Sequence, residues 1–156
     1  MNRVPAWLSF PWWWLLVVSL ILVTIQRIEH LRLSSPAILL LAWSVVQADW
    51  VKRADPRSRG IYWVMAAAAL YVAHLAIVLT EGTLALGAGL TLLLYLLIYV
   101  IAMISLCKDF ERLRDESGQP AMQMTTTLMA VLFGAYYFQF HLHEFAESQR
   151  ASTLEG

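Results

Sequence analysis

The stretch GIYWVMAAAALYVAHLAIVLTEGTLALGAGLTLLLYLLIYVIAMISLC, residues 60–107, decides the fold class of this chain. It consists of two windows without Asp, Glu, Lys or Arg, Gly60–Thr80 and Gly82–Cys107, separated by Glu81 alone. A helix that crosses a membrane needs about 20 mostly apolar residues, because in lipid its backbone polar groups must bond to one another. Both windows meet this requirement, and the connection between them leaves room only for a tight turn. The stretch therefore predicts an antiparallel hairpin of two transmembrane helices.

Outward from this hairpin, three more charge-free windows extend the pattern over the chain: Val4–Gln26, Leu33–Ala48 and Ser117–His143. We therefore predict an all-α integral membrane protein, a single polytopic membrane domain over residues 1–156 with four to five transmembrane helices. The expected helices cover residues 6–26, 35–50, 61–80, 83–107 and 121–143. The second window is short, since its length as a helix is about 24 Å against a hydrocarbon core of about 30 Å. It could span the bilayer, or it could be re-entrant or interfacial.

The composition supports a lipid-solvated surface. The chain is 60% hydrophobic and only 14% charged, whereas soluble domains carry about 25% charged residues. Its 11 basic and 11 acidic residues cancel, so no net charge favours a nucleic-acid partner. A single cysteine, Cys107, excludes an internal disulfide. The first apolar window is longer than the core of about 7–15 residues in a signal peptide, which predicts a retained anchor.

Basic residues predict the orientation, because they are enriched in cytoplasmic loops. With five spans, all but three of the 11 basic residues are cytoplasmic, the exceptions being Arg27, Arg32 and Arg150. With four spans, Arg3 and Arg150 are outside instead. Both readings place the C-terminus outside. The expected location is a bacterial inner membrane, crossed several times.

Small residues predict how the helices pack, because they allow close backbone approach in lipid. In the third window they recur at alternating spacings of three and four, as Ala66, Ala69, Ala73, Ala76 and Thr80. Gly89 and Gly134 belong to similar pairs in the fourth and fifth windows. We expect these three helices to form an antiparallel bundle through this seam, with Ala67 off the seam. The same pattern could instead serve an oligomer or a partner helix.

Four ionisable side chains are candidates for a cofactor or metal site. His74 lies inside the third window, where an ionisable group is by default a functional hypothesis. It could hold a haem iron or a divalent metal together with His141 or His143. His143 and Glu147, one helical turn apart, could also share a metal. The structural interpretation of His74 is favoured: a neutral ring bonded to a backbone carbonyl, to Tyr71 or to a neighbouring helix.

No nucleotide-binding loop, nucleophile elbow or CxxC motif is present, so the chain is not expected to be an enzyme. In size and hydropathy it resembles small bacterial inner-membrane proteins of four or five helices. That group includes accessory subunits of larger complexes and immunity proteins against membrane-active toxins. The resemblance implies a protein that acts through its helix faces, in the lipid bilayer, on another membrane protein or on itself. A membrane redox or cofactor protein that uses His74 is the alternative.

Overall fold

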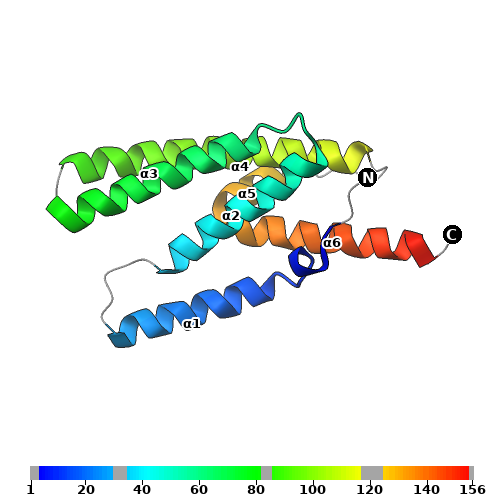
Figure 1. Cartoon of the computed structure of the whole chain (residues 1–156), viewed down its shortest axis with the longest axis horizontal. Coiled ribbons are helices and arrows are strands. Elements are labelled where there is room, and N and C mark those ends of the chain that lie inside the picture. The colour runs from blue at the N-terminus through cyan, green and yellow to red at the C-terminus, as the bar shows by residue number, and fades with distance from the viewer. Residues whose placement is uncertain (1–3, 30–34, 82–85, 117–124, 155–156) are drawn as a thin grey trace. The chain divides into compact units, whose positions relative to one another are not determined.

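The computed structural model describes residues 4–29, 35–81, 86–116 and 125–154, and every regular element in these ranges is a helix (Figure 1). The expected all-helical architecture is confirmed for this part of the chain. The helices, in order, are η1 (Ala6–Leu8), α1 (Trp13–Glu29), α2 (Ser35–Ala54), α3 (Gly60–Glu81), α4 (Leu86–Glu116), α5 (Thr125–Phe133) and α6 (Ala135–Leu154).

The chain divides into two compact units, with boundaries inside α2 and α5. Unit 1 contains residues 1–47 and 132–156, and unit 2 contains residues 48–131. Each unit has its own polar cluster and its own buried side chains, and each is described by itself below. That the whole chain forms one membrane domain stays a prediction.

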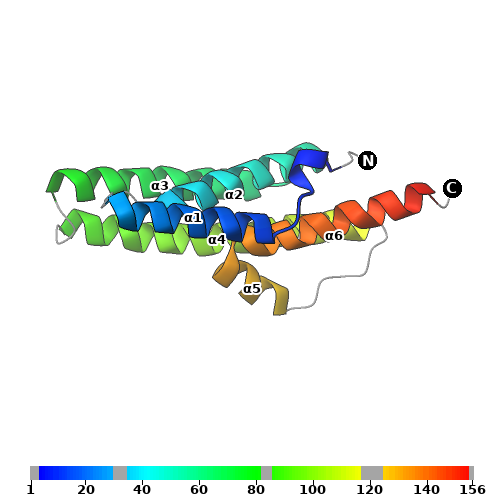
Figure 2. The same ribbon diagram turned by 90° about the horizontal axis from the view of Figure 1, so that it is seen from below.

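The predicted hairpin forms the body of unit 2, where α3 and α4 lie side by side and antiparallel (Figures 1 and 2). The face of α3 that packs on α4 carries Gly60, Val64, Ala67 and Tyr71, all buried. Gly60 allows the closest approach, since a Cβ atom there would lie 3.2 Å from the Cα of Leu106 on α4. α4 continues past the apolar window, which ends at Cys107, as far as Glu116.

The predicted small-residue seam is not the face that α3 turns to α4. Ala67, expected off the seam, is only 1% exposed, whereas Ala69, Ala73 and Ala76 are exposed and Ala66 is half-buried. The error has a simple cause: Ala66–Ala69 is a run of four alanines, so small residues occur on every side of the helix there. Spacing alone could not choose among these sides. On α4, a Cβ added at Gly89 would meet no atom within 4 Å, so Gly89 makes no close approach either.

Two of the described helices, α3 and α4, are long and apolar enough to cross a membrane. A shorter apolar helix covers Trp13–Ile25. Only 17% of the most apolar window of α3 and 22% of that of α4 is buried. Core helices of soluble proteins are mostly covered, so the bare apolar surface of this hairpin favours membrane association.

Two other expected helices are interrupted. The helix predicted over residues 121–143 is divided at Gly134, whose φ of 47° lies in the left-handed region. Glycine adopts this conformation without a steric penalty and commonly ends helices, so the seam residue Gly134 is a helix terminator. The α-helix predicted over residues 6–26 begins only at Trp13. Pro11 lacks an amide hydrogen and restricts the backbone conformation of the residue before it.

Candidate functional site

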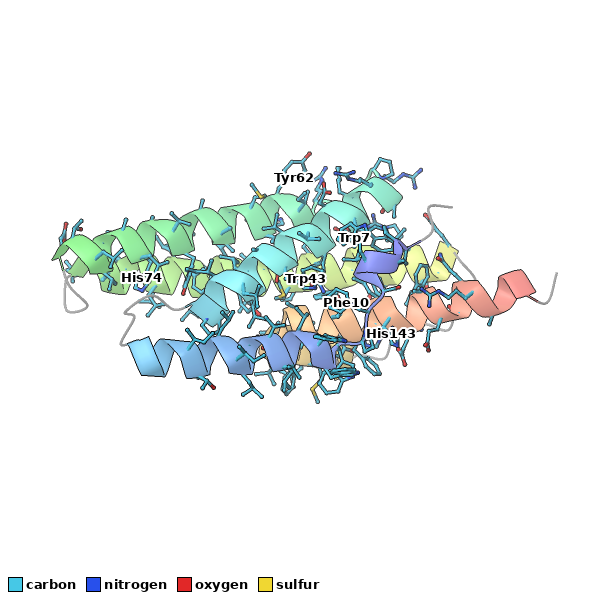
Figure 3. All side chains as sticks on the ribbon, turned by 60° about the horizontal axis from the view of Figure 1, so that its bottom comes forward. Trp7, Phe10, Trp43, Tyr62, His74 and His143 are labelled. Carbon is cyan, nitrogen blue, oxygen red and sulfur yellow. The ribbon has the colours of Figure 1, made fainter. Side chains whose placement is uncertain are left out.

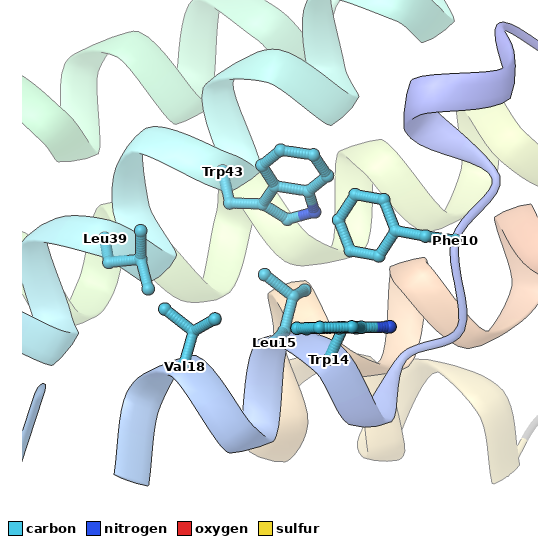
Figure 4. Close-up of a pocket in the computed structure, with 6 residues that line it drawn as sticks. All are labelled: Phe10, Trp14, Leu15, Val18, Leu39 and Trp43. Carbon is cyan, nitrogen blue, oxygen red and sulfur yellow. The ribbon is translucent and has the colours of Figure 1, made fainter. Parts of the chain in front are cut away.

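Unit 1 contains an apolar pocket with a volume of about 390 Å³ (Figure 4). Three aromatic and three aliphatic side chains line it: Phe10, Trp14, Leu15, Val18, Leu39 and Trp43. Its volume falls within the range of about 300–1,000 Å³ that is typical of small-molecule sites. The lining can contact a ligand through apolar surface and presents almost no polar group to it.

The sequence builds the pocket from two helical faces and one irregular segment. Val18 lies one turn after Trp14 on α1, and Trp43 lies one turn after Leu39 on α2, so each pair shares a face. Leu39 lies near Val18 and Trp43 lies near Phe10 (Figure 4), so α1 and α2 run antiparallel along the pocket. Phe10 comes from the chain before α1 and packs on Trp43 with ring centroids 5.1 Å apart.

A buried amide network adjoins the Trp43 side of the pocket. Gln139 on α6 is 0% exposed, and its Nε2 donates to the carbonyl oxygens of Leu8 at 2.9 Å and Phe10 at 2.7 Å. Its Oε1 accepts from Trp43 Nε1 at 3.0 Å and Gln47 Nε2 at 3.2 Å. One side chain thus ties the N-terminal segment and α2 to α6.

The indole of Trp43 fixes how both amides are oriented. An indole nitrogen only donates, so Gln139 must present its oxygen to Trp43 and Gln47 must present its nitrogen to Gln139. Gln47 Nε2 also donates to the carbonyl of Ala135 at 3.1 Å. The Oε1 of Gln47, a residue 1% exposed, is buried and has no hydrogen-bond partner among the described residues. It is an acceptor that only a hydrogen-bond donor can satisfy.

The N-terminal segment is held on the second half of α6 (Figure 3). His143 Nδ1 donates to the carbonyl of Ser9 at 2.6 Å, and Arg150 Nη2 donates to Ser9 Oγ at 3.0 Å. The backbone nitrogen of Val4 donates to Gln149 Oε1 at 3.3 Å. These contacts tie the segment before α1 to α6, and the number of spans stays a prediction.

The predicted cofactor histidines have ordinary partners. His74 Nδ1 donates to the carbonyl of Ala88 at 3.1 Å and to Thr91 Oγ1 at 3.3 Å, both on α4. The expected carbonyl partner on a neighbouring helix is confirmed. His141 Nδ1 lies 3.1 Å from Glu144 Oε2. Because His74 belongs to unit 2, and His141 and His143 belong to unit 1, their convergence on one cofactor stays a prediction.

The predicted metal pair is close but incomplete as a metal site. His143 Nε2 lies 3.5 Å from Glu147 Oε1. Within the described ranges, no three His, Cys, Asp or Glu side chains are grouped so that they could hold a metal ion. The pair therefore acts here as a surface contact on α6 beside the docked N-terminal segment.

A second polar cluster, in unit 2, ties the loop before α3 to α4. Asp109 Oδ2 accepts from Ser58 Oγ at 2.6 Å, from the backbone nitrogen of Gly60 at 2.8 Å and from that of Arg59 at 3.1 Å. Arg112 Nη1 donates to Asp55 Oδ2 at 2.9 Å. Both carboxylates are buried. Asp109 caps the N-terminus of α3 from another helix, where a negative charge is favoured.

Sequence reasoning missed both polar clusters. Asp109 lies outside the charge-free windows and was given no role, and Gln139 lies inside one of those windows without being singled out. A signal for Gln47 and Gln139 does exist, since polar amides among apolar residues commonly bond between membrane helices. Nothing in the local sequence separates Asp109 from its exposed neighbour Asp115.

Comparisons with known proteins found no matching family model, no similar curated protein and no similar solved structure. What the fold defines is the class: an all-helical protein, in the part of the chain described, with two helices able to cross a membrane.

Proposed function

We propose that this chain is a multi-pass protein of a bacterial inner membrane that acts by binding another membrane protein, or a second copy of itself, through its helix faces. It would serve as an accessory subunit or as an immunity-like factor, without catalysis of its own. The observation that supports this proposal is the outer face of α3, where Ala69, Ala73 and Ala76 are exposed.

This face carries small residues beside larger ones, a pattern suited to packing against a helix. The three alanines and Thr80 follow one another at spacings of four, three and four residues. The bulky side chains of Val72 and Leu79 beside them are 63% and 61% exposed. The hydroxyl of Thr80 donates to the carbonyl of Ala76 at 2.9 Å, so it presents no unsatisfied donor to lipid. Small residues between larger ones let a partner backbone approach closely.

The proposed topology has four spans, α1 to α4, with both termini in the cytoplasm. Two observations support it. α2 extends over Ser35–Ala54, about 30 Å at 1.5 Å per residue, which would span with the charged side chains of its last turns reaching the headgroup level. The break at Gly134 removes the reason to count residues 121–143 as one span, and with it the reason to place the C-terminus outside.

The charges fit this arrangement. With both termini inside, only Arg27 and Arg32 of the 11 basic residues are outside, which agrees with the positive-inside rule. The loop before α3 and the charged end of α4 are joined by the Asp109 and Asp55 contacts, so they share the cytoplasmic side as well.

The test of the interaction is site-directed photocrosslinking in cells. A photoreactive residue at Ala73 should give one discrete crosslinked product, whereas the same residue at Leu93, an exposed position on α4, should give none. The product should disappear when Ala76→Leu is added, because the larger side chain keeps a partner backbone from approaching this face closely. Leu93→Phe, which adds bulk to exposed α4, should leave it unchanged. Crosslinking that is equal at both positions, or that survives Ala76→Leu, would exclude this face as the interface.

A further inference from the structure

We propose that the apolar pocket of unit 1 binds one acyl chain of an anionic phospholipid, and that Arg150 binds the phosphate of the same lipid. This site goes beyond the proposed interaction function, and it rests on the proposed membrane location and topology. The inference comes from two features that meet at the N-terminal segment: a hollow with an apolar lining, and a cation that forms no ion pair with a carboxylate in the described ranges.

The hollow fits a hydrocarbon chain. All six of its lining residues are apolar, and five of them lie on α1 from Trp14 to Val18 and on α2 from Leu39 to Trp43. The pocket is therefore aligned with helices that run along the bilayer normal, as an acyl chain does. A polar solute would lose its hydrogen bonds to water in such a lining without replacement, whereas the surrounding bilayer supplies apolar chains at high concentration.

The cation is bonded to the residue that precedes an aromatic lining residue of the hollow. Phe10 lines the pocket, and Arg150 donates to the hydroxyl of the residue before it, Ser9, at 3.0 Å. Arg150 is exposed and forms no ion pair with any described carboxylate. A guanidinium has five N–H donors in a planar fork that suits phosphate oxygens, and the bond to Ser9 leaves most of them available.

The depth of the two features matches that of a phospholipid. Trp12 to Trp14 open α1 at this end, and tryptophan is enriched at the headgroup level of membranes. A phosphate there and a chain running along α1 are the two parts of one lipid. In the proposed topology this end faces the cytoplasmic leaflet, where basic groups attract anionic lipids.

The neighbouring charges limit the strength of the preference. His143 is bonded to the carbonyl of Ser9, and Glu147, one turn before Arg150, lies 3.5 Å from His143. A carboxylate so close to the site opposes a phosphate, so we expect a preference for anionic over zwitterionic lipid of roughly tenfold, which corresponds to about 1.4 kcal/mol.

The test is native mass spectrometry of the full chain in mild detergent, after delipidation and titration with phosphatidylglycerol or phosphatidylcholine of identical acyl chains. The wild type should retain one phosphatidylglycerol about tenfold better than phosphatidylcholine. Leu39→Trp, which fills the pocket, should lose both lipids, whereas Ile38→Trp, on the neighbouring exposed position, should not. Arg150→Gln should keep one lipid but lose the preference, unlike Lys108→Gln at an exposed position of unit 2.

Val18→Phe fills the pocket from α1 and replaces Leu39→Trp if that variant does not fold, as judged by its thermal midpoint. Three results would each overturn the proposal: equal retention by the wild type and a folded pocket-filled variant, equal binding of the two lipids by the wild type, or an unchanged preference in Arg150→Gln. Extraction of the protein from membranes by alkaline carbonate tests the membrane location separately, so its failure is distinct from the failure of the lipid site.

Discussion

At the scale of the residue, Gln139 has the largest structural role that the polar contacts reveal. Its amide makes four hydrogen bonds and joins three separate segments of unit 1. Polar groups in lipid cannot form hydrogen bonds to water instead. An amide whose nitrogen and oxygen are both hydrogen-bonded to the protein therefore specifies one arrangement of the segments.

We predict that Gln139→Leu destabilises unit 1 strongly, because it strands the Trp43 donor and two backbone carbonyls, and each stranded buried group costs about 1–3 kcal/mol. Gln47→Leu should cost much less, since its oxygen already lacks a partner. The measurement is the thermal midpoint of both variants in the same detergent. Equal midpoints for the two variants would contradict the central role of Gln139.

The second prediction at this scale concerns His74. His74→Gln should accumulate normally and melt near the wild type, because the glutamine amide can still donate to the Ala88 carbonyl that His74 now contacts. The purified wild type should show no Soret band. A Soret band that vanishes in His74→Gln would instead establish the haem interpretation, with His141 or His143 as the candidate second ligand.

At the scale of the element, the face that each helix buries decides which substitutions matter. α3 buries Val64, Ala67 and Tyr71 against α4, while its other alanines are exposed. The polar cluster around Asp109 also holds the start of α3 to α4. The hairpin is therefore stabilised by close packing along its length and by the Asp109 cap at the N-terminus of α3.

We predict that Ala67→Leu destabilises the hairpin by about 1–3 kcal/mol, the usual cost of overpacking. Ala73→Leu should leave its stability unchanged within about 0.5 kcal/mol, since that position is exposed. Thermal melting of the two variants, which carry the same added isobutyl bulk, measures the difference directly. If Ala73→Leu were the more destabilising of the two, the predicted small-residue seam would be the face of α3 that packs on α4.

At the scale of the whole molecule, the proposed topology makes the most direct prediction. Reporters fused before Val4 and after Glu155 should both report the cytoplasm, together with one inserted near Arg57. A cysteine introduced at Lys108 should be labelled only after the membrane is permeabilised. A C-terminal reporter that is active outside would restore α5 and α6 as a crossing and would refute the four-span arrangement.

The helical class, the α3–α4 hairpin and the apolar surface followed from the sequence by itself. Length and apolarity are local properties. In lipid, a single apolar segment can bond all of its own backbone polar groups only as a helix. A glycine or a proline also affects the local backbone conformation. Whether Gly134 packs against another helix or ends its own helix depends on its φ, which the residue type does not determine.

Only the tertiary structure decided which face of α3 is buried, why Asp109 differs from Asp115, and where a pocket opens. Each of these depends on which distant segment lies opposite. Ala67 is buried because α4 covers it, Asp109 because the start of α3 directs its amides at it, and Trp43 lines a pocket because Phe10 packs against it. Such contacts join residues far apart in the chain, and their energies depend on the partner as much as on the residue itself.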